Sequence, residues 1–184
     1  HHEPATHALA LAVNQALGAF GATLGLLEAP ADERPTHLEA VSRLAADLEA
    51  GAVRTLVILG GNPAWDAPAD LDMAARIESV ETTVHLGLYR DETGGRSTWH
   101  LPAAHDLESW GDGRAWDGTL TLQQPLIAPL YDGWTPAQLL AVIASGETVS
   151  AHDLVRERFA AEVAGGGSEA AWRQALNDGV VRDT

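Results

Sequence analysis

Apolar residues recur at the spacing of one helix face near the start of the chain, where Pro4 suits the first helical position. The apolar stripe of this helix is Leu9, Val13, Leu17 and Phe20. A polar loop with Pro30 and Pro35 follows. Thr36 and Glu39 then form the capping box that precedes a helix, and a glycine closes that second stretch. The pattern therefore predicts two N-terminal helices.

Two short apolar runs follow, over residues 53–60 ("VRTLVILG") and 82–89 ("TTVHLGLY"). The first run is continuous rather than alternating, which is typical of a strand buried on both faces of a parallel sheet. A short helical pattern over about 69–79 separates the two runs. A strand, a helix and a second strand form a βαβ unit, whose right-handed crossover makes a parallel pair the default.

The character of the sequence changes between residues 90 and 134, which are rich in Trp, Gly, Pro and acids. We expect short strands around 98–101 and 119–123, with turns between them. The tryptophans of this segment are expected in the core and at interfaces, because their rings are apolar and carry one donor. They are Trp99, Trp110, Trp116 and Trp134.

The C-terminal third is helical again, with three expected N-caps at Thr135, Ser150 and Ser168. The final residues, from Val180, look like the beginning of a strand. The predicted fold is α/β: a Rossmann-like three-layer unit with a mostly parallel sheet, an irregular Trp/Gly/Pro-rich segment and a helical C-terminal extension. We divide it into a lobe over 1–134 and a helical extension over 135–184, which we expect to continue beyond the chain end.

Composition excludes several classes of function. The 184 residues carry a net charge of -15, and all 11 basic residues are arginine, so phosphate backbones would repel the chain. The chain contains no cysteine, so it cannot supply thiolate ligands for iron–sulfur clusters. No apolar run approaches the roughly 18 residues that a membrane span requires.

The loop Gly60-Gly61-Asn62-Pro63 ends the first predicted strand and has two interpretations. In a nucleotide site, glycines would let backbone N–H groups approach the ligand, and Asn62 would bond a base or ribose. As a plain turn, the glycines permit the bend and Pro63 fixes it. Because the loop matches neither GxGxxG nor a P-loop, the plain turn is favoured. One glycine should hold a positive φ, and Asn62 should bond backbone two residues on.

Candidate ligating side chains gather in two other places. His100, His105, Asp106 and Glu108 invite a metal interpretation, but their spacing suits no single helix face, so buried or capping histidines are favoured. We therefore assign no metal ligand and no catalytic residue, and His85 is expected to be a core or sheet-face residue.

Asp91, Glu92 and Thr93 follow the second predicted strand. They could grip a ribose or amino group at the strand end, or brace a turn or helix cap. The sequence favours neither role.

The order of these pieces resembles the molybdopterin oxidoreductase superfamily. The opening helix carries an Asn-x-x-Leu-Gly core, the first strand leads into Gly-x-Asn-Pro, and Glu-Thr, Leu-Pro, Glu-x-x-Gly and Gly-Thr follow in order. The positions concerned are Asn14, Leu17 and Gly18, then Gly61, Asn62 and Pro63, then Glu92-Thr93, Leu101-Pro102, Glu108 with Gly111, and Gly118-Thr119. Trp-His-Leu-Pro, Leu-Glu-Ser-Trp-Gly-Asp and Gln-Pro-Leu-Ile-x-Pro-Leu-Tyr resemble one branch more closely, the iron–sulfur, molybdopterin-like large subunit of bacterial alternative complex III.

The resemblance implies that the chain is one lobe of a larger subunit. Its cofactor would be molybdopterin guanine dinucleotide, approached by Gly60, Gly61, Asn62 and Pro63 and lined by Glu92 and Thr93. Ser97-Thr98 and Gln123-Gln124 depart from the superfamily pattern. We therefore expect the six cofactor-contacting residues just named to be a vestigial site, and the chain itself to bind no cofactor.

The leading expectation is therefore a fragment of a respiratory, quinol-oxidising electron-transfer subunit that serves mainly as scaffold. The resemblance places it on the periplasmic side of the bacterial inner membrane. Its partners would be other domains and subunits of a membrane-bound complex, with iron–sulfur clusters outside this chain and neither nucleic acid nor direct membrane insertion involved. Alternatives are the cofactor-binding lobe of an active molybdenum bis(pterin guanine dinucleotide) oxidoreductase, or a free-standing α/β protein that binds a small molecule.

Overall fold

The computed structural model describes residues 2–26 and 35–181. The chain divides into two compact units, His1–Glu33 and Arg34–Thr184. The first contains helix α1 (Pro4–Ala16), which begins at the predicted Pro4. Of the loop expected to follow, Pro30 lies outside the described residues.

The second unit begins with helix α2 (His37–Glu49), whose predicted capping box is confirmed. Glu39 N–H donates to Thr36 Oγ1 at 3.3 Å, and Thr36 N–H donates back to Glu39 Oε2 at 2.8 Å. The reciprocal pair satisfies donors that the first helical turn would otherwise leave unpaired.

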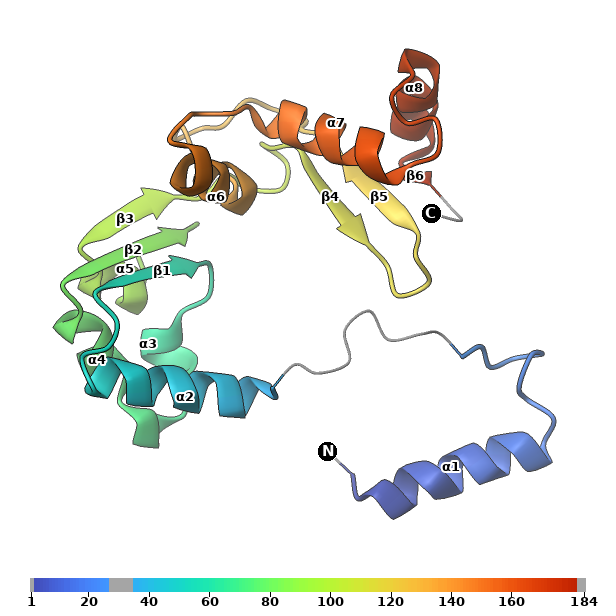
Figure 1. Cartoon of the computed structure of the whole chain (residues 1–184), viewed down its shortest axis with the longest axis horizontal. Helices are drawn as coiled ribbons and strands as arrows, with labels where there is room; N and C mark the ends of the chain where they lie inside the picture. Colours follow the sequence, from blue (N-terminus) through green and yellow to red (C-terminus); the bar gives the residue numbers. More distant parts are fainter. Residues whose placement is uncertain (1, 27–34, 182–184) are drawn as a thin grey trace. The chain divides into compact units, whose positions relative to one another are not determined.

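A three-stranded parallel sheet confirms the α/β class. Its strands are β1 (Thr55–Leu59), β2 (Thr82–Gly87) and β3 (Trp99–Pro102), with β2 in the centre. All three arrows run the same way in Figure 1. The parallel pairing of the first two strands is as predicted. The pairing of β3 with β2 adds a third parallel strand from the Trp-rich segment.

The connections within this sheet are more broken than the sequence predicts. They contain four short helices: α3 (Pro63–Asp66), η1 (Ala69–Leu71), α4 (Met73–Ser79) and α5 (Glu92–Arg96). The single helix expected over 69–79 is wrong, because Asp72 adopts a left-handed conformation with φ 42° and separates η1 from α4. Helices this short carry too little periodicity to be read from the chain.

One face of the sheet is covered by these helices. Leu48 of α2 and Met73 of α4 form a core cluster against which Leu56 of β1 packs. Leu56 pairs in register with Thr83, and Ile58 pairs with His85, so these four side chains share a face. Thr83 and His85 are therefore buried polar residues on the helix-covered face.

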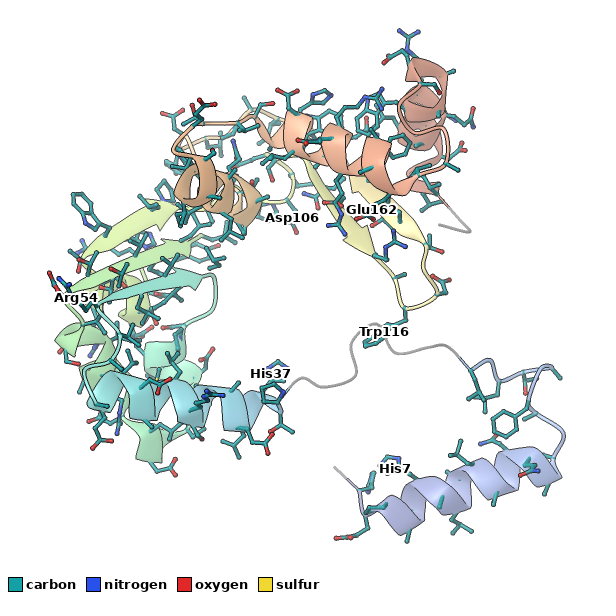
Figure 2. All side chains as sticks on the ribbon, viewed as in Figure 1. His7, His37, Arg54, Asp106, Trp116 and Glu162 are labelled. Carbon is teal, nitrogen blue, oxygen red and sulfur yellow. The ribbon has the colours of Figure 1, made fainter. Side chains whose placement is uncertain are left out.

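A second sheet, which is antiparallel, lies further along the chain. It consists of β4 (Gly111–Arg114), β5 (Leu120–Gln123) and β6 (Val180–Val181), with β5 in the centre. The strands expected near 119–123 and at Val180 are confirmed, whereas β4 is missed because Gly-Asp-Gly-Arg has no strand-like apolar pattern. Figure 2 shows Trp116 at the tip of the β4–β5 hairpin, where it is exposed rather than in the core.

The C-terminal helices are α6 (Pro136–Ser145), α7 (Ala151–Glu162) and α8 (Glu169–Asp178). Their predicted N-caps, Thr135, Ser150 and Ser168, each accept a backbone hydrogen bond from the first turn. Phe159 and Trp172 from α7 and α8 share one apolar cluster with Leu120 and Leu122 of β5. The predicted division at 134 thus runs between parts that pack on one core, and it remains a prediction.

Candidate functional site

The Gly-Gly-Asn-Pro loop lies at the carboxyl end of β1, the edge where open α/β sheets hold ligands. Gly60 and Gly61 have φ values of 79° and 74°, so the expected positive φ is confirmed at both positions. Only glycine adopts such a conformation without strain, which explains the pair. Pro63 then occupies the first turn of α3, where its missing N–H costs nothing.

Asn62 joins this loop to the start of α5. Its Nδ2 donates to Glu92 Oε2 at 2.7 Å, and its Oδ1 accepts from Thr93 N–H at 3.1 Å and from Thr93 Oγ1 at 2.8 Å. Thr93 Oγ1 in turn accepts from Ala64 N–H at 3.0 Å. We call this group of bonds the Asn62 clasp. The structure therefore brings together Asn62, Glu92 and Thr93, which the sequence singles out separately.

The prediction that Asn62 bonds backbone two residues on is wrong. The side chain instead reaches thirty residues along the chain, because the parallel pairing of β1 and β2 places the loops after both strands at one edge. Its hydrogen bond to Glu92 lowers the pKa of that carboxyl group, so Glu92 is a carboxylate at neutral pH. Asn62, Glu92 and Thr93, the residues proposed to contact a ligand, are therefore hydrogen-bonded to one another.

Asp91 caps α5: its Oδ1 accepts from Gly94 N–H at 2.8 Å. The sequence leaves two roles open for Asp91, contact with a ligand and bracing of a turn or helix cap. In the structure Asp91 is the helix cap. The same carboxylate oxygen lies 3.8 Å from Nδ1 of the buried His85.

His85 and His100 face each other across β2 and β3, an arrangement that sequence reasoning misses. Their Nδ1 atoms are 3.2 Å apart, and His85 Nε2 lies 3.1 Å from the carbonyl oxygen of Gly61. His85 is 0% exposed, as expected of a core residue. Burial lowers the pKa of His100, and the adjacent His85 lowers it further. Only the in-register pairing of β2 with β3 could have revealed the pair.

His105 has a separate role in the turn that follows β3. Its Nδ1 accepts from Leu107 N–H at 3.1 Å, while its own N–H donates to Glu108 Oε2 at 3.2 Å. This is the capping role favoured for it, and its partners differ from those of His100. Within residues 2–26 and 35–181, no three His, Asp or Glu side chains gather as metal ligands would.

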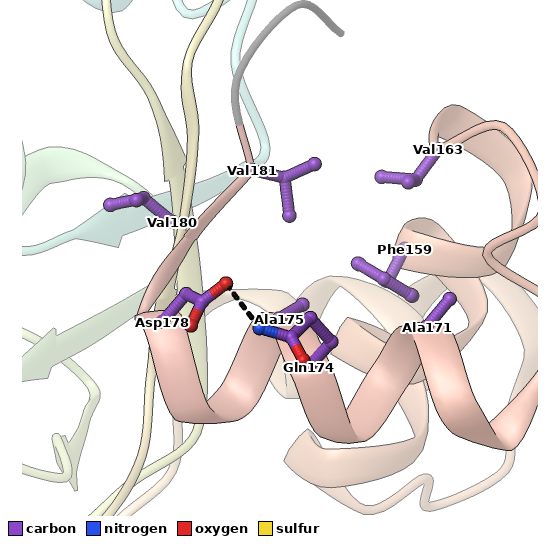
Figure 3. Close-up of a pocket in the computed structure, with 8 residues that line it drawn as sticks. All are labelled: Phe159, Val163, Ala171, Gln174, Ala175, Asp178, Val180 and Val181. Carbon is purple, nitrogen blue, oxygen red and sulfur yellow. Dashed lines mark hydrogen bonds between the residues drawn. The ribbon is translucent and has the colours of Figure 1, made fainter.

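Two of the hollows among the described residues differ in their relation to the candidate site. One, of about 340 Å³, lies at the carboxyl edge of the parallel sheet and is lined in part by Gly60, Gly61, Asn62, Leu86, Tyr89 and Asp91. The other, of about 540 Å³, is apolar and lies between α7, α8 and β6, with Phe159 at its wall and the Gln174–Asp178 hydrogen bond at its rim (Figure 3). The first contains candidate site residues, whereas the second contains none.

Comparison with protein-family models found no match, and a search of curated proteins found none either. In the part of the chain that the structure describes, no helix combines the length and apolarity needed to cross a bilayer. The resemblance to molybdopterin oxidoreductases therefore stays a prediction from the motifs.

Proposed function

We propose that this chain is a scaffold lobe of a molybdopterin-oxidoreductase-like subunit in a membrane-bound, quinol-oxidising respiratory complex on the periplasmic side of the membrane. In this proposal the iron–sulfur clusters lie in other domains. The chain contributes structure and assembly rather than chemistry.

The Asn62 clasp carries the proposal. Both ends of the Asn62 amide are bonded within the chain, to Glu92 and Thr93, and Thr93 is 0% exposed. A nucleotide that bonded to Asn62 would first have to break these hydrogen bonds. The free energy needed to break them would weaken its binding. A pyrophosphate near Glu92 and Asp91 would also meet two carboxylates, in a chain whose net charge is -15.

An exposed apolar segment supports the assembly role. Over residues 124–131, the side chains of Leu126, Leu130 and Tyr131 are 76%, 67% and 80% exposed. The segment is anchored rather than free, because Leu126 N–H donates to Leu107 O at 2.8 Å. Anchored apolar side chains that face solvent are typical of surfaces that another protein part covers.

Calorimetry of the purified chain with GDP and GTP tests the absence of a nucleotide site. We expect no binding tighter than about micromolar, which corresponds to roughly -8 kcal/mol. Asn62→Ala should lower thermal stability, because it leaves the buried Thr93 N–H without its acceptor, and should leave the calorimetric result unchanged. Tighter binding, or pterin or molybdenum that co-purifies with the chain, would overturn the scaffold proposal.

The assembly role is tested in the subunit that contains this chain. Leu126→Asp with Leu130→Asp should reduce the amount of assembled complex on a native gel. Leu38→Asp is the matched control, because Leu38 of α2 is 60% exposed outside the segment. Equal amounts of complex in the wild-type and double-variant subunits would contradict the role of the segment.

The second candidate is the cofactor-binding lobe of an active molybdoenzyme. The hollow of about 340 Å³ favours this candidate. The hollow lies at the carboxyl edge of the parallel sheet, and its lining includes Gly60 and Gly61, which both have a positive φ. In this candidate Gly61 and Asn62 would approach the guanine nucleotide, Glu92 and Thr93 would line its pocket, and Asn62 would give up its bonds to those two residues. The same calorimetry decides between the two candidates.

A further inference from the structure

The hydrogen bonds of His85 and His100 define which nitrogen of each ring carries a proton. A carbonyl oxygen only accepts, so His85 Nε2 must carry the hydrogen that it donates to Gly61 O. A neutral His85 then has a bare Nδ1, and His100 must donate its own Nδ1–H across the 3.2 Å gap. Neutral His85 is thus the Nε2–H tautomer and neutral His100 the Nδ1–H tautomer.

The pair can accept one further proton without losing a bond. The vacant position is Nε2 of His100, a residue that is only partly buried, whereas His85 is fully enclosed. Asp91, whose carboxylate lies 3.8 Å from His85 Nδ1, offsets the added charge. A second added proton can go only to His85 Nδ1. Both Nδ1 atoms would then be donors, and two cations would face each other, one of them fully buried.

Two glycines bring the backbone close to the rings. A Cβ atom at Gly87 would lie 2.6 Å from His85 Cε1, and one at Gly94 would lie 2.8 Å from His100 Nδ1. The two glycines therefore mark where the backbone of β2 and α5 closes on the rings. His85 is fully enclosed, so repulsion that displaces its ring moves the backbone around it, and the bond from His85 Nε2 to Gly61 O is lost with it.

We propose that His85 and His100 form an acid-sensitive latch, which admits one added proton and releases the Gly60–Asn62 loop from α5 when a second one binds. Release separates the Asn62 clasp and opens the 340 Å³ hollow at the carboxyl edge of the sheet. The latch stands on this geometry and does not depend on the scaffold proposal.

The neighbouring charges act on the latch in both directions. Asp91 on the N-terminus of α5 raises the pKa of His100, while Arg90, from the loop after β2, lowers it. Glu92 is bonded to Asn62, so it belongs to the clasp that the latch releases. Burial and His85 lower the pKa of His100. The closed state therefore binds protons more weakly than the open state, so acid favours opening.

Nitrogen-15 NMR of the histidine side chains tests the tautomers directly. At about pH 8, above the ordinary histidine pKa of about 6.5, His85 should be the Nε2–H form and His100 the Nδ1–H form. Any other combination overturns the latch. Titration with zinc chloride is run alongside, and stoichiometric binding that shifts both Nδ1 signals would make the pair a metal site and also overturn it.

Hydrogen exchange at the Thr93 amide, corrected for intrinsic rates, reports on release. Its protection should fall at least about tenfold for each pH unit below about 6.5, because the open pair takes up at least one more proton than the closed pair. His100→Asn supplies an amide that donates to a neutral His85 Nδ1 and, turned over, accepts from a protonated one, so His85 gains its proton without opening and the pH dependence should flatten. His105→Asn, on the separate turn, should keep it. A steep pH dependence that persists in His100→Asn would overturn the latch, and the tautomer measurement decides if that variant fails to fold.

Discussion

At the scale of single residues, the paired imidazoles of His85 and His100 explain why a glycine stands at a position where no turn requires one. Gly94 lies within α5 with an ordinary backbone conformation, yet a Cβ there would lie 2.8 Å from His100 Nδ1 and 3.1 Å from His85 Nδ1. Its neighbour Gly95 has no atom within 4 Å of such a Cβ. Two adjacent glycines of one helix thus have different reasons to be glycine.

This difference predicts opposite effects of one substitution. Gly94→Ala should destabilise the protein by about 1–3 kcal/mol through overpacking. Gly95→Ala should be neutral or stabilise it by about 0.5–1 kcal/mol, because alanine is the better helix former. Chemical denaturation of both variants measures the two values. Equal effects of the two substitutions would contradict the packing of α5 on the histidine pair.

At Gly60, in the loop after β1, glycine is required by the backbone conformation and not by a lack of space for a side chain. No heavy atom lies within 4 Å of a Cβ at Gly60, but its φ is 79°. Gly60→Val should therefore cost more than the ~1 kcal/mol of an ordinary glycine change. Gly60→Asn should cost less, because asparagine tolerates left-handed backbone. Thermal unfolding compares the two variants, and a valine variant as stable as the asparagine one would refute the role of strain.

At the scale of elements, capping decides where helices begin, and ion pairs help to fix the helices to neighbouring strands. Arg158 of α7 pairs with Asp112 of β4 at 3.0 Å and with Glu162 at 3.0 Å, so the helix is tied to the second sheet by charge as well as by the core around Phe159. The bonds from Arg114 and Arg158 lower the pKa of Glu162. This contribution to stability is present above the ordinary glutamate pKa and is lost as the pH falls through the lowered one.

The capping box of α2 provides a direct test of local sequence. Thr36→Ala removes the side-chain acceptor for Glu39 N–H and should cost about 1 kcal/mol. Thr36→Ser keeps the oxygen and should cost much less, which makes it the matched control. The midpoint of urea unfolding measures both variants. An alanine variant as stable as the serine one would show that the box contributes nothing.

At the scale of the whole molecule, the acidic charge opposes compaction. A net charge of -15 on 184 residues without lysine leaves few cations to offset carboxylate repulsion. Raising NaCl from about 10 mM to about 500 mM shortens the screening length from about 30 Å to a few ångströms and should raise the melting temperature. KCl should act like NaCl. A melting temperature that falls with both salts would contradict dominant self-repulsion.

Much of this architecture can be predicted from the chain itself, because the relevant information is local. Pro4, the Thr36–Glu39 box and the caps at Thr135, Ser150 and Ser168 act within one helical turn, so their positions follow from neighbouring residues. The continuous apolar run of β1 and the positive φ at Gly60 and Gly61 are likewise written in adjacent side chains. The α/β class follows from the alternation of these elements.

The candidate site depends on contacts that no local pattern contains. The pairing of β3 with β2 brings His100 to His85, and the shared edge of β1 and β2 brings Asn62 to Glu92 and Thr93. Residues fifteen and about thirty positions apart meet only when the register is chosen, and register is decided by the packing of whole faces. The sequence by itself thus determined the elements and the bend of the loop, while the tertiary structure alone decided that the loop bonds to the chain's own side chains.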